Sequence, residues 1–209
     1  MRSLHARLRR FAGSFAGALV AALALCVGTT PAARAAVLAQ TSPSAVTYDF
    51  GVDFGILTGS GTGDVTALLF VVDVNLDPPR ANTSGCEAAD FMGMLDGSIA
   101  LIQRSLCTFE QKVLNAQAAG ADGVLIFNQG NTADRLGLFG GTLGDNNVID
   151  IPVLSTTYGL GALLALSTAP ITIHIEVTAD DLAAVPVPAT VALLILGVAG
   201  MGAVRSRRR

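Results

Sequence analysis

Hydrophobic and polar positions in the middle of the chain follow short periods that predict a domain rich in β-strands. Apolar, β-branched runs at residues 64–74, 98–103, 123–127 and 151–155 are bounded by turn residues, as is typical of buried strands. Residues 171–177 instead alternate strictly. Four apolar side chains point to one face and Thr172, His174 and Glu176 to the other, which predicts a half-buried, antiparallel closing strand.

Helical spacing appears between two of these strands. Thr108 is a suitable N-cap, and Gln111 stands three residues later, where a capping box places its partner. Apolar residues then recur at helical spacing from Phe109, and Gly120 is a natural end. Strand, helix and strand within about 30 residues predict a βαβ unit with parallel strands. A second short helix is expected over 156–166.

The remaining segments are predicted from weaker patterns. Residues 45–52 alternate loosely and suggest a strand, whereas 36–43 are small and polar and are expected to be disordered. Residues 128–150, rich in Gly, Asn and Asp, predict a long surface loop that is a candidate interaction surface. Its candidate contact residues are Gln129, Asn131, Asp134, Arg135, Asp145, Asn146, Asn147 and Asp150.

The N-terminus has the order of a secretory signal peptide. Four arginines within the first ten residues precede an uncharged stretch at 11–27, and Ala33-Arg34-Ala35 fits a small-residue cleavage site after Ala35. An uncleaved membrane anchor is one alternative. A lipoprotein lipidated at Cys26 is another, although Leu25 stands where that signal needs a small residue.

The C-terminus, residues 185–209, carries a proline motif, an apolar segment and an arginine cluster. Residues 189–204, at about 1.5 Å per residue, give a helix of about 24 Å, short of a hydrocarbon core of about 30 Å. Arginines after the helix predict a cytoplasmic end and an external body. The motif residues are Val185, Pro186, Val187, Pro188, Ala189, Arg205, Arg207, Arg208 and Arg209.

Charge divides the body, 36–184, from the two ends. All 16 acidic residues lie in the body, which has only four basic ones: Arg80, Arg104, Lys112 and Arg135. Because this excess of negative charge repels phosphate backbones, a nucleic-acid partner is not expected. Cys86 and Cys107 form an even pair in an oxidising compartment and are predicted to bridge, with two free buried thiols as the alternative.

No catalytic or metal-binding set emerges from the residue pattern. Outside the leader the one histidine is His174, so an ordinary zinc site cannot be assembled, and no cofactor is expected. Neither a nucleophile elbow nor a phosphate-binding loop is present. A nonstandard calcium site remains open at Asp73-x-Asn75-x-Asp77 or within 145–150, although Pro78 and Ser84 replace residues that a calcium loop needs.

Two segments resemble known families. Gly85-Cys86-Glu87, Ser98–Arg104, Cys107–Ala121, Gly123–Asn128 and Ile151–Ser155 together resemble a protease-associated (PA) domain over about 82–166, with Ser105 in place of the usual Gly. The resemblance implies an α+β, β-rich sandwich or open barrel, with the central βαβ unit and short flanking helices. This fold accompanies secreted peptidases, and its role there is to influence substrate or partner access.

The C-terminal segment resembles the PEP-CTERM class of sorting signals in its VPLPA-like form, with Val187 in place of Leu. That resemblance implies processing by an exosortase-type enzyme near Pro188-Ala189 and transfer to the cell surface or matrix. Retention as a membrane anchor is the alternative.

These observations divide the chain into a signal peptide (1–35), one PA-like domain (36–184) and a sorting signal (185–209). They lead to the expectation of an exported, non-catalytic module that is not an enzyme and binds an envelope protein or polysaccharide. A secreted hydrolase or peptidase-related enzyme or accessory subunit is one alternative. A structural matrix protein is the other.

Overall fold

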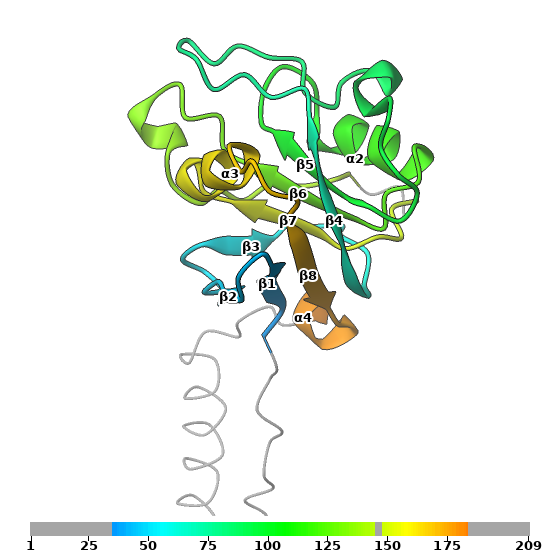
Figure 1. Cartoon of the computed structure of the whole chain (residues 1–209). Helices are drawn as coiled ribbons and strands as arrows, with labels where there is room; N and C mark the ends of the chain where they lie inside the picture. Colours follow the sequence, from blue (N-terminus) through cyan, green and yellow to red (C-terminus); the bar gives the residue numbers. More distant parts are fainter. Residues whose placement is uncertain (1–34, 145–147, 184–209) are drawn as a thin grey trace, which may run out of the picture. The chain divides into compact units, whose positions relative to one another are not determined.

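The computed structural model describes residues 35–144 and 148–183, which form a curled, half-barrel sheet with a few short helices (Figure 1). Eight strands follow one another across this sheet in the order β2-β1-β8-β4-β5-β6-β7-β3. The sequence prediction of a β-rich fold with short flanking helices is thereby confirmed.

The strands are β1 (Val37–Ser42), β2 (Val46–Thr47), β3 (Phe54–Ile56), β4 (Gly63–Val72), β5 (Ile99–Gln103), β6 (Gly123–Phe127), β7 (Val153–Thr156) and β8 (Thr172–Val177). The helices are η1 (Ala88–Phe91), α2 (Phe109–Ala118), η2 (Ala133–Arg135), α3 (Tyr158–Ala165) and α4 (Ala179–Ala183).

The long strand β4 joins two kinds of pairing. Its first half pairs antiparallel with β8, from Gly63 opposite Val177 to Leu68 opposite Thr172. Its second half pairs in parallel with β5, and β5, β6 and β7 continue in parallel. Strand β8 also pairs antiparallel with β1, with Val37 opposite Glu176. The antiparallel closing strand predicted at 171–177 is therefore present.

The central strands are buried on both faces, which explains their uninterrupted apolar runs. Along β5, Ile99 and Leu101 point into one hydrophobic cluster, while Ala100 and Ile102 point into another. The first cluster contains residues of α3, β1 and β8, and the second contains Val113 of α2. Each cluster removes apolar surface from water, the main favourable term in folding.

Helix α2 begins and ends as its sequence predicts, with one difference. The Thr108 hydroxyl accepts a hydrogen bond from the Gln111 amide at 3.1 Å, and Gly120 adopts a φ of +89° at the end. The Gln111 side chain, however, donates to Asn115 at 2.9 Å and does not return to the cap. Thr157 caps α3 in the same way, accepting from the Leu160 amide.

Two segments at the edges of the sheet differ from the sequence prediction. Residues 37–42, expected to be disordered, form β1 because the exposed edge of β8 supplies hydrogen-bond partners that no local pattern reveals. Strand β3 was missed altogether, since it is three residues long and is defined by its pairing with β7. Conversely, residues 45–52 hold only the two-residue β2 before a turn.

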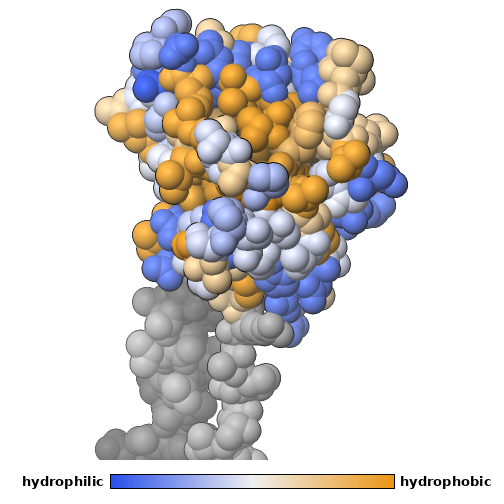
Figure 2. Space-filling model, in the orientation of Figure 1, coloured by the Kyte–Doolittle hydropathy of each residue, from blue (hydrophilic) through white to orange (hydrophobic). Residues whose placement is uncertain are grey.

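The surface on the side of α3 is notably apolar. Figure 2 shows apolar surface across the middle of the face that carries α3, with hydrophilic surface along its upper edge. Leu163 and Leu166 are 68% and 70% exposed and border a groove of about 500 Å³ beside β2.

Within residues 35–144 and 148–183, no helix combines the length and the hydropathy needed to cross a bilayer. The predicted leader up to Arg34 and the whole predicted sorting signal lie outside the described residues.

Helix α3 lies so close to β6 that one of its two glycines is required. A Cβ on Gly161 would stand 2.1 Å from the Phe127 side chain, whereas a Cβ on Gly159 would meet nothing within 4 Å. The two positions therefore form a matched pair, in one helix, for testing how α3 packs on the sheet.

We expect Gly161→Ala to destabilise the fold by about 1–3 kcal/mol, because overpacking forces the helix or Phe127 to move. Gly159→Ala should be neutral or stabilise by up to about 1 kcal/mol through helix propensity. Urea unfolding of both variants measures the difference. Equal effects of the two substitutions would show that α3 does not pack in this way.

Candidate functional site

Polar residues gather where the parallel strands end. Arg104 follows β5, Asn128 follows β6 and Thr157 follows β7, and the carboxyl ends of parallel strands share one edge of a sheet. The ladder continues just past the strands, since the amide of Arg104 donates to the Phe127 carbonyl at 2.8 Å and that of Asn128 to the Thr156 carbonyl at 3.1 Å. This edge is where α/β sheets present their ligands.

A buried polar network underlies the edge. The fully buried Ser84 hydroxyl donates to the Val72 carbonyl and accepts from the Gln103 amide. The Gln103 side chain in turn accepts from the Asn75 amide at 2.8 Å and donates to the Asn75 carbonyl at 2.9 Å. These bonds link the ends of β4 and β5 to the loop between β4 and η1, which contains Asn75 and Ser84, so the polar groups are satisfied and fixed in place.

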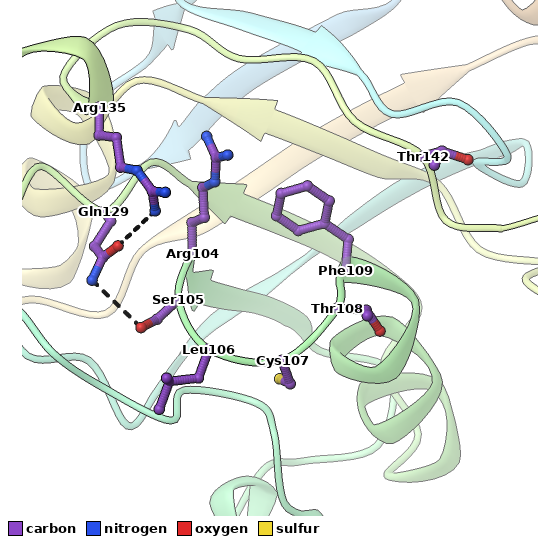
Figure 3. A pocket seen from close by; sticks show the side chains of 9 residues that line it. All are labelled: Arg104, Ser105, Leu106, Cys107, Thr108, Phe109, Gln129, Arg135 and Thr142. Atoms are coloured by element: carbon purple, nitrogen blue, oxygen red, sulfur yellow. Dashed lines mark hydrogen bonds between the residues drawn. The ribbon is translucent and has the colours of Figure 1, made fainter.

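A cavity of about 590 Å³ opens at this edge, and we call it the arginine pocket (Figure 3). It is lined by Arg104, Ser105, Leu106, Cys107, Thr108, Phe109, Gln129, Arg135 and Thr142. Its residues come from the β5–α2 connection, from the segment after β6, from η2 and from the approach to β7. Its volume falls in the range of small-ligand sites.

The guanidinium group of Arg104 lies over two aromatic rings. Its guanidinium carbon lies 4.8 Å from the centre of the Phe139 ring and 5.6 Å from that of Phe109, and one of its nitrogens donates to the Asn128 side chain at 3.3 Å. Burial, followed by the nearby charge of Arg135, lowers the pKa of Arg104 from its usual value. The side chain nevertheless stays charged, as guanidinium groups do in proteins.

Arg135 enters the pocket on the side of Arg104 that faces away from the Phe109 ring (Figure 3). It donates to the Gln129 side-chain oxygen at 2.9 Å, and the Gln129 amide nitrogen donates to the Ser105 hydroxyl at 3.4 Å (Figure 3). The same nitrogen donates to the Arg80 carbonyl at 3.0 Å. Arg80 itself binds the Gly130 carbonyl at 2.7 Å. Three of the body's four basic residues thus meet at this edge.

The disulfide predicted from sequence is present and restrains one wall of the pocket. Cys86 and Cys107 are joined with their Cα atoms 5.8 Å apart. Behind them Lys112 is fully buried, and its ammonium donates to the Ser84 carbonyl and lies 3.7 Å from the Cys86 sulfur. Burial lowers the pKa of Lys112 from 10.5 to about 8, although Asp90 and Glu87 act in the opposite direction.

The residues singled out in the 128–150 loop do not form one surface. Gln129 and Arg135 line the arginine pocket, with Asp134 exposed beside Arg135 on η2. Asn131 is also exposed near this edge, whereas Asp150 precedes β7 and therefore lies at the other end of the strands, where its amide binds the Gln117 side chain at 3.1 Å. Asp145, Asn146 and Asn147 lie outside the described residues.

Sequence reasoning missed the contribution of Arg104 and Phe109 to a site. Neither residue is among the site candidates predicted from the sequence, because a lone arginine after a strand and an aromatic residue at a helix start are common in cores. The available signal was positional, since Arg104 directly follows a buried parallel strand and a ligand site is expected at that end.

The other candidate residues have local partners. His174 on β8 bonds the Thr66 hydroxyl at 2.9 Å and lies 3.7 Å from Asp64, both on β4. In the candidate calcium loop, the Asn75 side-chain oxygen accepts from the Asp77 amide at 3.1 Å. Over 35–144 and 148–183, no group of three or more His, Cys, Asp or Glu side chains could hold a metal ion.

Comparison with known proteins identifies the domain. Residues 65–164 match the PA domain family, so the predicted PA domain is confirmed for that range. A 124-residue segment, 59% of this chain, is 52% identical to 23% of a Pseudomonas aeruginosa protein named "Aminopeptidase". A 144-residue segment, 63% of the chain, is 28% identical to 28% of a Mycobacterium tuberculosis protein named "Probable lipoprotein aminopeptidase LpqL".

Solved structures lead to the same class of protein. The aminopeptidase from Aneurinibacillus sp. strain AM-1 matches 68% of this chain and 30% of its own, with 29% identity and a TM-score of 0.52. BSAP, titled a zinc aminopeptidase from Bacillus subtilis, shares the fold at 23% identity over 68% of this chain and 29% of its own, with a TM-score of 0.50.

These findings correct the expectation of a non-catalytic module that is not an enzyme, because the relatives are named aminopeptidases and point to a peptidase-related protein. The expectation rested on two points: the residue pattern shows no catalytic set, and the PA resemblance alone could account for the body of the chain. Neither point determines the class of protein to which the relatives belong. The chain spans about a quarter of the length of the curated relatives it matches. The described residues do not offer a ligand set for the zinc that the BSAP title names.

The buried Lys112 predicts how stability depends on pH. Because the pKa is about 8 in the folded state and near 10.5 in the unfolded state, the folded protein releases this proton first. The unfolded state then binds more protons between these values, so the free energy of unfolding should rise with pH across that window, by at most about 3 kcal/mol.

Urea unfolding at a series of pH values from 7 to about 11 tests this expectation against Lys112→Met, which lacks the titrating group. The rise should be present in the native protein and absent from the variant. Tyrosines, including Tyr48 with its raised pKa, act equally in both proteins and cancel in the comparison. If the free energy of unfolding changed with pH in the same way in both proteins, Lys112 would not be the group responsible for the rise.

Proposed function

We propose that this chain is an exported, peptidase-related protein that takes part in an aminopeptidase reaction through its PA domain. The observation that carries the proposal is the 52% identity to the Pseudomonas aeruginosa aminopeptidase over 124 residues. The fold shared with the Aneurinibacillus aminopeptidase, at 29% identity, supports the same reading.

The geometry is suited to contact with peptides. The arginine pocket combines two guanidinium groups, a fixed amide and the ring of Phe109, and these groups can bind the polar and apolar parts of a short peptide. The disulfide and the buried polar network hold the pocket walls in place before any ligand arrives, which lowers the entropy cost of binding.

Export and sorting to the envelope form the second part of the proposal. The leader, the proline motif at 185–189 and the closing arginines favour transfer to the cell surface by an exosortase-type enzyme. The name of the Mycobacterium tuberculosis relative, a probable lipoprotein, also supports a location outside the cytoplasm.

We expect the full chain to support hydrolysis of aminoacyl-p-nitroanilides. It should be assayed alone, with and without added Zn²⁺. It should also be assayed mixed with the Pseudomonas aeruginosa aminopeptidase from which the matching segment has been deleted. Turnover by the chain alone, or increased turnover of the shortened enzyme, supports the proposal. The same chain, reduced and unfolded, is the control, and no turnover in either arm would refute it.

Sorting can be followed separately by mass spectrometry. Protein released from the envelope of the expressing cell should lack the residues after the proline motif, whereas Pro186→Ala/Pro188→Ala protein should keep them and stay in the membrane fraction. An intact C-terminus in surface protein from the unmodified chain would show that the tail is a retained anchor.

A further inference from the structure

We propose that the arginine pocket binds the C-terminal carboxylate of a short peptide between Arg104 and Arg135. The recognition of a carboxylate rests on the pocket itself. The assignment of that carboxylate to a peptide rests on the proposed aminopeptidase-related function.

The first observation is the charge distribution. The body contains four basic residues against 16 acidic ones, yet two of the four line one cavity and a third, Arg80, adjoins it. Like charges brought together repel one another, and this repulsion contributes to the lowered pKa of Arg104. An anion placed between the two guanidinium groups would remove that repulsion.

The second observation concerns the partners of the two guanidinium groups. Within the described residues, no carboxylate lies within 4 Å of Arg104 or Arg135, and their hydrogen-bond acceptors are the neutral amides of Asn128 and Gln129. Asp134 is fully exposed and is held by the Thr132 hydroxyl, and it acts on Arg104 and Arg135 through its charge. Among the described residues, the positive charge of the pocket is therefore not neutralised by a direct contact.

The third observation is the orientation of the donors. Stacking on Phe139 and the bond to Asn128 fix the plane of the Arg104 guanidinium, and Gln129 fixes one nitrogen of Arg135. Each group still has further N–H donors, and the planar fork of arginine matches the two oxygens of a carboxylate. In Figure 3 the Arg104 guanidinium lies between Arg135 and the Phe109 ring.

The pocket walls favour a peptide end over a bare anion. Phe109 and Leu106 are apolar, and Leu106 is 81% exposed at the rim, where an apolar residue gains contact when a ligand covers it. Ser105 places a hydroxyl beside this apolar surface (Figure 3). A terminal carboxylate next to an aliphatic side chain presents the matching combination of groups.

Direct binding tests the proposal with the full, oxidised chain. Isothermal titration compares N-acetyl-Ala-Leu, which has a free carboxylate, with the same peptide as its C-terminal amide. We expect the acid to bind about tenfold or more tightly than the amide, because hydrogen bonds to a charged group contribute a free energy of that size. Inorganic phosphate should compete more weakly than the peptide acid.

Variants assign the effect to the two arginines. Arg104→Gln and Arg135→Gln should each weaken binding of the acid by about tenfold and leave binding of the amide unchanged. Asp134→Asn changes the charge beside Arg135 by one unit without removing a guanidinium, and should leave the affinity for the acid within about threefold or raise it. Circular dichroism and the melting temperature check that each variant is folded.

The proposal is overturned if acid and amide bind equally, if neither binds, if phosphate competes as well as the peptide acid, or if folded arginine variants retain full affinity. Because binding is measured without turnover, it is independent of the aminopeptidase assay. Carboxylate-selective binding without hydrolysis would leave this inference standing and refute the proposed reaction. Hydrolysis without carboxylate selectivity would do the reverse.

Discussion

Burial of β5 and β6 on both faces is the constraint on which the rest of the domain depends. Side chains that alternate along these strands enter two separate hydrophobic clusters, so each face must be covered. Helix α2 covers one face, while α3 and the curled part of the sheet cover the other. The parallel pairing follows from the same requirement, because a helix that covers a face also returns the chain to its starting edge.

Because these strands are buried on both faces, most polar and charged side chains of this region lie at the strand ends. The core admits Ser84, Gln103 and Lys112 only as members of hydrogen-bonded networks, and the remaining cationic groups emerge together at the carboxyl edge. The disulfide and Lys112 stabilise the connection between β5 and α2 from behind, and the aromatic rings hold Arg104 in front. The arrangement of the pocket is thus determined by elements whose main role is packing.

Local signals were sufficient for much of the fold and for little of the site. The apolar runs, the Thr108 cap, Gly120 and the cysteine pair act within a few residues or through oxidation, so the sequence shows them directly. Strands β1 and β3 depend on partners about 100 or more residues away, and the short patterns of these strands carry no such information. The meeting of Arg104 with Arg135 likewise depends on sheet order. The expectation of a non-catalytic module failed for a further reason, because the catalytic groups that a residue pattern reveals do not determine the class of protein to which its relatives belong.

The neighbouring positions of β1 and β8 have a consequence for how such a domain is combined with others. The chain enters the sheet at Val37 and leaves it after Val177, and Val37 is paired with Glu176. Entry and exit are therefore adjacent, so the whole unit can be spliced into a surface loop of a host protein without pulling the host's own ends apart. A domain whose two ends lie side by side can be inserted into a larger chain, or removed from it, as one continuous segment, and its hydrophobic core stays intact.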